Sequence, residues 1–380
     1  MSLDPTQGAG IPAELIAMYS EAELQLLQMM VSAIVAGIDS PDWLANQTGE
    51  MLRFRAQAQA LAAQLQANMP AMINQALDEA QAAGIDAADA DADELPDALH
   101  KPERPGRDNT AAKNEAWRTL SKFTQRLPGA AEELYRDVTV QVQVRNREIP
   151  RPGARTGALH GAVTPEGTRL DAAQQALDIL TKRGITGFRD AAGRNWSLTS
   201  YVEMKSRTMV NQELIDSHTD RLLERGQTLV VVSSHKNPSP QCQPYEGQIL
   251  SLDGATGTVI RPSAVSDRSV KVRVKATLRE ARANGFQHPN CKHAISGYVP
   301  GASSTFKTKP DPEGYEATQK QRAMERAIRD TKRQQMVAVT PAAKRETTAR
   351  LRAQQAALKA HLNEWDLKRR PNREKATGAR

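Results

Sequence analysis

Apolar residues recur at helical spacing from residue 11 to residue 84, in a stretch dominated by alanine and glutamine. Residues 11–37 (IPAELIAMYSEAELQLLQMMVSAIVAG) form one such pattern, which Gly37 can end. Residues 40–84 form a second, with Ser40 as N-cap and a break expected near Pro70. Alanine favours helix but buries little area, and aromatic residues make up only 4% of the chain. We therefore expect extended helices around one modest globular core.

The rest of the chain divides by composition and periodicity. The Asp-Ala-Asp alternation after residue 84 lacks the glycine and closing glutamate of a calcium loop, so it predicts a solvated linker. The predicted regions are an acidic Ala-rich helical region (1–84), an acidic linker (85–109), a helical region interrupted at its Leu-Pro-Gly (110–184), a central α+β core (185–310) and a basic helical tail (311–380). The predicted fold class is α+β, with a helical N-terminal region, a small central β-rich domain and a basic helical C-terminal tail.

The strongest strand patterns lie in the central region. Residues 228–234 (TLVVVSS) are short and valine-rich, and residues 269–275 (SVKVRVK) alternate apolar with basic side chains, as a half-buried strand does. Ahead of them, DAAGR at 190–194 predicts the tip of a hairpin. The helix that follows this hairpin carries His218 on its apolar side, where we expect a buried, hydrogen-bonded histidine.

Charge is distributed unevenly. Residues 1–100 hold 2 Lys and Arg against 15 Asp and Glu, whereas residues 314–380 hold 17 against 7. The ends of the chain are therefore expected to meet different partners, and a basic segment with few apolar residues is typical of contact with nucleic acid. No stretch is long and apolar enough for a membrane helix, no basic and apolar leader opens the sequence, and two cysteines make no disulfide framework. These features favour a cytoplasmic origin.

Two cysteines and several histidines form the one group with metal-ligand spacing. HPNCKH (288–293) contains Cys291 and His293, and the other cysteine, Cys242, lies seven residues after His235. Zinc takes four cysteine and histidine ligands, often from two loops, so these four residues are a candidate structural zinc site. The alternative is that both cysteines are small buried residues and that His288 and His293 cap turns. A disulfide is disfavoured in the cytoplasm.

The same residues also permit an enzyme. A cysteine–histidine nucleophile needs a third group to orient the histidine, and Glu246 is available in the sequence. A metal-dependent nuclease would use His235 or His288 as its base. The spacing selects neither arrangement, and the sequence contains no Gly-rich phosphate loop, GxSxG or HExxH motif.

Three motifs in order, GITGFRDAAGRNWSLTSYVEMKSRTMVNQ, VVVSSHKNPSPQCQPYEGQILSLDG and HPNCKHAISGYVPG, resemble the minor capsid protein 2 family of tailed phages. That family is similar to the Mu F-type head-morphogenesis proteins, and the resemblance covers roughly residues 110–370. It implies a structural virion protein at the portal, acting in head assembly or in DNA packaging and ejection. It implies no catalytic activity. The rival interpretation is a phage-borne zinc-dependent nuclease or toxin-like enzyme.

The resemblance also implies roles for single positions. Many F-type relatives carry a Cys-x-x-Cys before an acidic residue and glycine, and a Cys-x-Cys after His-Pro-Asn. Carried over, the first pair falls on Ser239 and Cys242 ahead of Gly247, and the second on Cys291 and His293. Serine at 239 leaves one ligand missing unless His235 replaces it, so a metal-free pairing of the loops remains open. The remaining motif positions are His288, Pro289 and Asn290.

The implied partners are the portal protein, other head or scaffold proteins, and packaged DNA, with no membrane. The implied location is the capsid interior at the portal vertex, after synthesis in the host cytoplasm. DNA contact through the tail would be independent of sequence and sensitive to salt. The residues predicted to make it are Arg326, Arg329, Lys332, Arg333, Lys368, Arg369 and Arg370.

Overall fold

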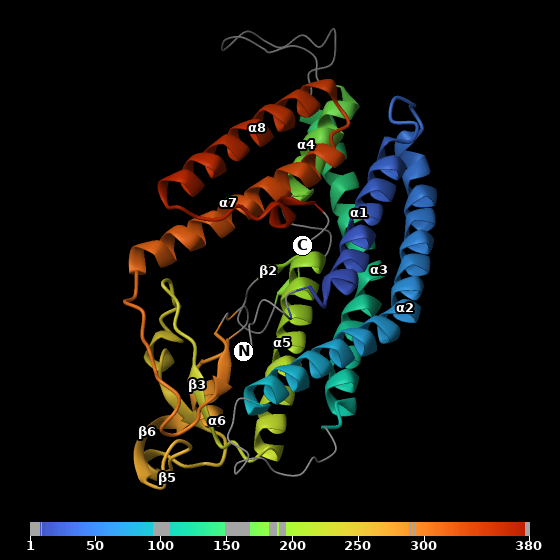
Figure 1. The fold of residues 1–380 in the computed structure, drawn as a ribbon. Helices are drawn as coiled ribbons and strands as arrows, with labels where there is room; N and C mark the ends of the chain where they lie inside the picture. The colour runs from blue at the N-terminus through green and yellow to red at the C-terminus, as the bar shows by residue number, and fades with distance from the viewer. Residues whose placement is uncertain are drawn as a thin grey trace. The chain divides into compact units, whose positions relative to one another are not determined.

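The computed structural model describes residues 8, 10–93, 107–148, 168–181, 188–189, 195–288, 291 and 293–376. It is mainly helical, with a small mixed sheet (Figure 1), which confirms the α+β prediction. The described helices are α1 (Ala13–Val35), α2 (Trp43–Asp93), α3 (Thr110–Glu148), α4 (Arg169–Thr181), α5 (Leu198–Glu224), α6 (Leu278–Ala283), α7 (Pro312–Met336), α8 (Pro341–Glu364) and the 3-10 turns η3 (Gln243–Tyr245) and η4 (Pro371–Glu374).

Two long helices continue where the sequence predicts breaks. Pro70 lies inside α2 and Pro128 inside α3. Each proline removes a backbone donor, which disfavours helix by about 3 kcal/mol. The flanking residues offset that cost by burial, because Met69 and Ile73 beside the first proline and Leu127 beside the second are almost fully buried. The predicted interruptions at these two prolines are therefore wrong.

The helix α2 also extends into the predicted linker. Residues 85–93 form its last turns, while residues 94–106 lie outside the described part of the chain. One acidic side chain of this segment, Asp89, accepts hydrogen bonds from Arg221 at 2.8 Å and from Arg225 at 3.0 Å. Ala88 and Ala92 of the same turns are fully buried. Tertiary contacts thus keep the first part of the linker helical.

The residue contacts of the chain define two units. Unit 1 comprises Met1–Leu15, Met69–Thr119 and Glu203–Lys320, and unit 2 comprises Ile16–Asn68, Leu120–Val202 and Gln321–Arg380. Five of the described helices, α1, α2, α3, α5 and α7, contribute residues to both units.

Unit 1 contains a five-stranded sheet with the order β5-β6-β4-β3-β7. Neighbouring strands are antiparallel except for the parallel pair β4 and β6. Leu229, Ile249, Val272 and Val274 form its apolar face, as the valine-rich and alternating patterns predict. The strands are β3 (Leu229–Val232), β4 (Ile249–Ser251), β5 (Gly257–Pro262), β6 (Ser269–Thr277) and β7 (Ile295–Gly297).

The C-terminal part of α2 packs against α5 and reaches the sheet. A Cβ atom on Gly84 would lie 2.4 Å from the backbone oxygen of Leu214, so the two helices approach closely at this glycine. Beyond it, one carboxylate oxygen of Asp91 lies 3.2 Å from His218 Nε2 and accepts the backbone N–H of Gly297 in β7 at 2.9 Å. The prediction of a buried, hydrogen-bonded His218 is confirmed, since its side chain has no exposed area.

Unit 2 is a helical assembly with its own core. Tyr19 of α1 lies 2.6 Å from Thr124 Oγ1 of α3, and burial raises the pKa of Tyr19 to about 12. Phe54 of α2 stacks on Tyr135 of α3 with ring centroids 5.4 Å apart. A short hairpin, β1 (Phe188–Arg189) with β2 (Asn195–Trp196), confirms the predicted hairpin, although its tip at 190–194 lies outside the described residues.

The two basic helices of the tail, α7 and α8, lie side by side (Figure 1). Ile328 of α7 packs with Leu358 and Leu362 of α8. Thr340 caps the start of α8 by accepting the backbone N–H of Ala343 at 3.1 Å. The predicted helical tail is confirmed. Within the described residues, no helix is both long enough and apolar enough to cross a membrane.

Candidate metal centre

Two loops of unit 1 meet at one end of the sheet. Val232, the last residue of β3, pairs with Ile295, the first residue of β7. The loop that leaves β3 contains Cys242, and the loop that enters β7 contains Cys291 and His293. Because the two strands are neighbours, these loops are brought together although they are distant in sequence. The prediction that both cysteine loops meet in space is confirmed.

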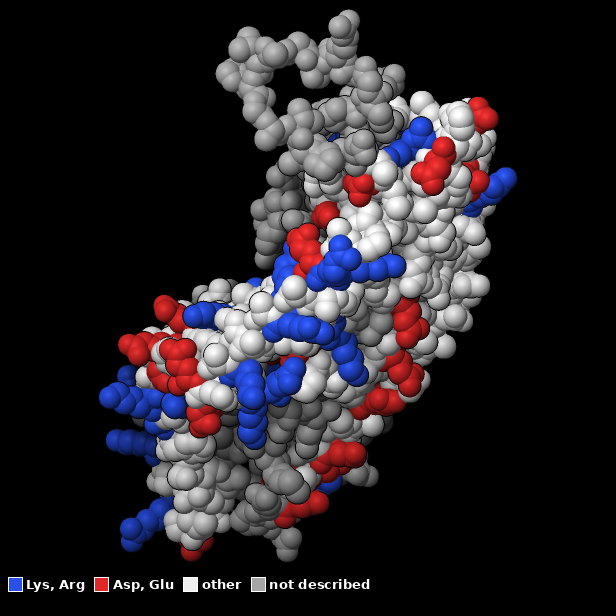
Figure 2. Space-filling view, turned by 90° about the horizontal axis from the view of Figure 1, so that it is seen from above, with Lys and Arg blue, Asp and Glu red and all other residues white. Residues whose placement is uncertain are grey.

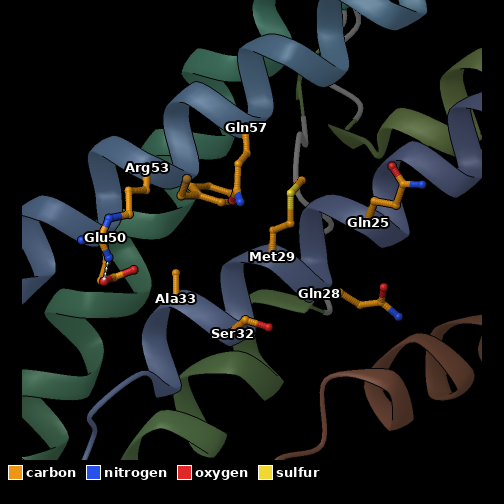
Figure 3. Close-up of a pocket in the computed structure, with 9 residues that line it drawn as sticks. Gln25, Gln28, Met29, Ser32, Ala33, Glu50, Arg53 and Gln57 are labelled. Carbon is orange, nitrogen blue, oxygen red and sulfur yellow. Dashed lines mark hydrogen bonds and ion pairs between the residues drawn. The ribbon is translucent and has the colours of Figure 1, made fainter.

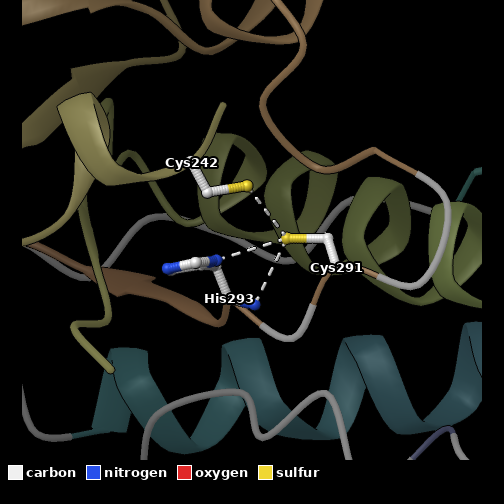
Figure 4. Close-up of side chains that lie close together, drawn as sticks. All are labelled: Cys242, Cys291 and His293. Carbon is white, nitrogen blue, oxygen red and sulfur yellow. Dashed lines mark hydrogen bonds between the residues drawn. The ribbon is translucent and has the colours of Figure 1, made fainter. Parts of the chain in front are cut away.

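Cys242, Cys291 and His293 point toward one another (Figure 4). The two Sγ atoms are 3.5 Å apart, and Cys291 Sγ lies 3.3 Å from His293 Nδ1. All three potential ligand atoms fall within 4.8 Å of one another. Both cysteines are unbonded thiols. Three of the four predicted ligands therefore form one compact group.

Glu246 contacts the nitrogen of His293 that faces away from Cys291. Its carboxylate is fully buried, and Oε1 lies 3.0 Å from His293 Nε2. The same oxygen accepts the backbone N–H of His235 at 2.7 Å. The sequence names Glu246 only as the third member of a nucleophilic pair, and the structure places it where it orients the His293 ring.

The close contacts change the pKa values of the group. The hydrogen bond between the thiols lowers the pKa of Cys242 and raises that of Cys291, whose burial acts in the same direction. Burial alone would lower the pKa of His293, but its contacts with Cys242 and with the Glu246 carboxylate outweigh burial and raise it. A catalytic cysteine beside a histidine needs a lowered pKa, and by the direction of these shifts Cys242 meets that requirement while Cys291 does not.

The other two histidines of the motifs lie differently. His235, predicted as the fourth ligand, is not part of the three-atom group: its Nε2 lies 3.2 Å from Ser233 Oγ, and its ring packs edge-on against His293. His288 also lies outside that group, and its Nε2 lies 2.8 Å from Ser239 Oγ, in the loop that carries Cys242. The spacing of the sequence did not single out His288, because both histidines are close to a cysteine in the chain.

The backbone geometry at Gly247 requires glycine at this motif position. Its φ of +64° belongs to the left-handed region, and a Cβ atom would lie 2.4 Å from the backbone oxygen of Phe306. Its N–H donates to the backbone oxygen of Val232, which fixes the return of the loop to the sheet. Pro289 and Asn290, the other motif positions, lie outside the described residues.

The predicted DNA-contact residues differ in exposure. Arg326, Lys368 and Arg370 are exposed, and Arg329 and Lys332 are half-buried. Arg333 is buried and lies 3.5 Å from the Glu23 carboxylate, so it is not placed for contact with phosphate. Arg369 is exposed but donates two hydrogen bonds to Glu374, at 2.7 and 2.8 Å.

Other basic residues of the tail lie on α8. Arg345, Arg352 and Lys359 are all exposed and follow one another at intervals of seven residues. Seven residues are close to two helical turns, so the three side chains lie along one stripe, which we call the α8 basic stripe. The seven-residue spacing of these three residues is visible in the sequence and could have predicted the α8 basic stripe.

A groove of about 470 Å³ lies between α1 and α2 in unit 2 (Figure 3). Its lining is mainly amide and aliphatic, with one ion pair between Glu50 and Arg53. The lining residues are Gln25, Gln28, Met29, Ser32, Ala33, Glu50, Arg53, Phe54 and Gln57. Since none of them is a cysteine or histidine, this groove offers no counterpart to the Cys/His group.

Comparison with known proteins gives one match. The family model described as phage minor capsid protein 2 matches residues 3–363. No curated protein and no solved structure matches the chain. The family match includes nearly all of the acidic N-terminal region, the motifs and the tail up to residue 363.

Proposed function

The chain belongs to the phage minor capsid protein 2 family, and we propose that it acts at the portal vertex of a tailed-phage head. Membership in the family supports a structural role in the capsid, a location in the virion and contacts with other head proteins. The proposal adds that the protein binds the portal and acts in head assembly or in DNA packaging and ejection. The match over nearly the whole chain carries this proposal, because it leaves little of the chain for an unrelated domain.

The two ends of the chain carry opposite net charges, so we propose that they contact different partners. The acidic first hundred residues would be repelled by DNA, so they are suited to contact with the portal or with scaffold protein. The basic tail would meet the packaged DNA. Such contact releases counterions and needs no base recognition. On the face drawn in Figure 2, Lys and Arg side chains lie among Asp and Glu side chains.

We place the principal DNA contact on the α8 basic stripe. Along the helix axis, each of its three residues, Arg345, Arg352 and Lys359, lies about 10.5 Å from the next, at 1.5 Å per residue. All three are exposed, whereas Arg333 of the original prediction is buried. Arg326, Lys368 and Arg370 would add contacts from elsewhere in the tail.

The test measures DNA binding of the full chain as a function of salt. Changing Arg345, Arg352 and Lys359 to glutamine should reduce the slope of log affinity against log salt by about 3, since each phosphate contact contributes about 0.9. A matched control changes three exposed basic residues of β6, Lys271, Arg273 and Lys275, and removes the same charge from the sheet. Equal losses in both variants would show that net charge, and not the stripe, governs binding.

The portal contact has a separate test. Purified portal protein should retain the full chain, and changing the exposed acidic residues Glu21, Asp39 and Asp42 to their amides should weaken this binding while DNA binding is kept. Retention of this variant at full strength would contradict the assignment of the portal contact to the acidic helices. Circular dichroism should first show that the variant remains folded.

A further inference from the structure

We propose that Cys242, Cys291, His293 and His288 hold one structural zinc ion that joins the two loops at the end of the sheet. This site is independent of the portal proposal, because it rests on distances within unit 1. It replaces His235 of the sequence prediction with His288.

Two of the three separations among the grouped ligand atoms are close to those that a tetrahedral zinc ion requires, and the third is within 4.8 Å. Zinc–sulfur bonds of about 2.3 Å and zinc–nitrogen bonds of about 2.0–2.1 Å place two sulfurs about 3.8 Å apart and a sulfur and a nitrogen about 3.6 Å apart. The observed separations are 3.5 Å between the thiols and 3.3 Å between Cys291 Sγ and His293 Nδ1. Each pair needs to open by only about 0.3 Å to admit the ion.

The surroundings of His293 fit a metal ligand. A histidine that binds metal through one nitrogen commonly donates its other N–H to a carboxylate, which fixes the ring and its tautomer. Glu246 Oε1 lies 3.0 Å from Nε2, on the side of the ring away from the thiols. With the proton on Nε2, the lone pair of Nδ1 is directed toward the sulfurs. The Glu246 carboxylate is itself held, because it accepts the backbone N–H of His235.

Both remaining histidines lie outside the three-atom group, and their hydrogen bonds favour His288 as the fourth ligand. The backbone oxygen of His288 accepts the N–H of Cys291 at 2.8 Å, and its Nε2 lies 2.8 Å from Ser239 Oγ in the loop of Cys242, so its imidazole lies between the two cysteine loops. The Nε2 atom of His235 faces Ser233 Oγ at 3.2 Å, and the same hydroxyl accepts the backbone N–H of Ala294. His235 therefore belongs to the hydrogen bonds that join β3 to the segment before β7. Ser239, which lies 2.8 Å from His288 Nε2, is placed to orient the His288 ring.

The charges of this ligand set also suit a buried ion. Two thiolates and two neutral imidazoles balance the charge of Zn²⁺, which makes burial of the assembly less costly than burial of an unpaired ion. Cys242 is fully buried and His293 is 5% exposed. The ion would close a loop of 49 residues between the cysteines and would hold the two loops without a disulfide.

The experiment measures zinc in the full chain, purified under reducing conditions, by elemental mass spectrometry and by competition with a chromogenic chelator. We expect one zinc per chain. Cobalt substitution should give the intense visible bands of a tetrahedral site together with sulfur-to-cobalt charge transfer. Cys242→Ser, Cys291→Ser and His293→Gln should each lose the ion, and Glu246→Gln should weaken binding by about 10- to 100-fold.

Two matched variants test the fourth ligand. His288→Ala should weaken zinc binding by more than about 100-fold, the upper end of outer-shell effects, whereas His235→Ala should weaken it by less than about 10-fold, the lower end. The reverse order would overturn the assignment of His288. A chain that is folded by circular dichroism yet binds neither zinc nor cobalt would overturn the site itself. So would recovery of the two cysteines as a disulfide, with unchanged loop protection in hydrogen exchange after reduction.

Discussion

Alanine in place of Gly84 tests the close contact between α2 and α5 that carries Asp91 to the sheet. A Cβ atom at this position would lie 2.4 Å from the backbone oxygen of Leu214 and 3.0 Å from the backbone nitrogen of His218. Neither atom can move by a change of rotamer, so the helices must separate. Gly49 in the same helix is the matched control, because a Cβ atom there meets nothing within 4 Å.

The two substitutions should change stability in opposite directions. Alanine gains about 1 kcal/mol over glycine inside a helix, and this gain applies at both positions. At Gly84 the backbones must move apart by about 1 Å, and overpacking of this kind costs about 1–3 kcal/mol. Because the obstructing atoms are backbone, we expect a cost near the upper end. The net loss at Gly84 is then about 2 kcal/mol, against a gain of about 1 kcal/mol at Gly49.

Native-state hydrogen exchange, read by mass spectrometry on peptides from α5 and from the C-terminal part of α2, measures this difference within unit 1. Gly84→Ala should speed exchange about 30-fold in both segments, which is the rate equivalent of about 2 kcal/mol. Gly49→Ala should leave exchange in α5 unchanged and slow it near its own position in α2. Equal protection of α5 in the two variants would refute the close approach at Gly84.

Three further substitutions have defined outcomes. Asp89→Asn should lower stability by about 2 kcal/mol, because it removes the carboxylate shared by Arg221 of α5 and Arg225, the residue after α5, although Arg221 keeps its ion pair with Glu224. Burial would raise the pKa of Asp89, but its hydrogen bonds with the two arginines outweigh burial and lower it. The stability that the Asp89 carboxylate gives the fold is therefore complete above about pH 4 and is lost as pH falls through the folded pKa. The free energy of unfolding should accordingly fall less steeply with acid in the variant. Gly247→Ala should cost about 3 kcal/mol in urea unfolding, since it combines a positive φ with a clash against Phe306, and a cost below about 1 kcal/mol would contradict this geometry. Tyr19→Phe should cost about 1 kcal/mol by the same assay, the value of one buried hydrogen bond, and no loss would show that the hydroxyl is dispensable.

The sequence predicts the long helices well but not their continuity. Pro70 is a sound local signal for a break, yet Met69 and Ile73 bury enough area to keep α2 intact. The close approach of α5 to α2 has a signal in the sequence that the amino-acid composition does not reveal. Small residues recur four apart at Ala80, Gly84 and Ala88, and all three are buried. Such a ridge permits two backbones to approach, but the sequence does not identify the partner helix.

The sequence predicts the cysteines of the candidate metal centre but does not identify all of its histidines. Cysteines are rare in this chain, so Cys242 and Cys291 in two motif loops could be expected to meet. The choice between His235 and His288 depends on which hydroxyl each ring faces, and no spacing in the sequence encodes that. Burial of Arg333 was equally hidden, because a basic residue on an amphipathic helix can face either solvent or a buried carboxylate such as Glu23.

The central proposal is that this protein is a structural component of the portal vertex. A cryo-EM reconstruction of purified phage particles, focused on the portal vertex without imposed capsid symmetry, tests it most directly. We predict density beside the portal into which unit 1 and unit 2 can each be fitted as separate bodies. A well-resolved vertex without such density, in particles whose protein content includes this chain, would contradict the proposal.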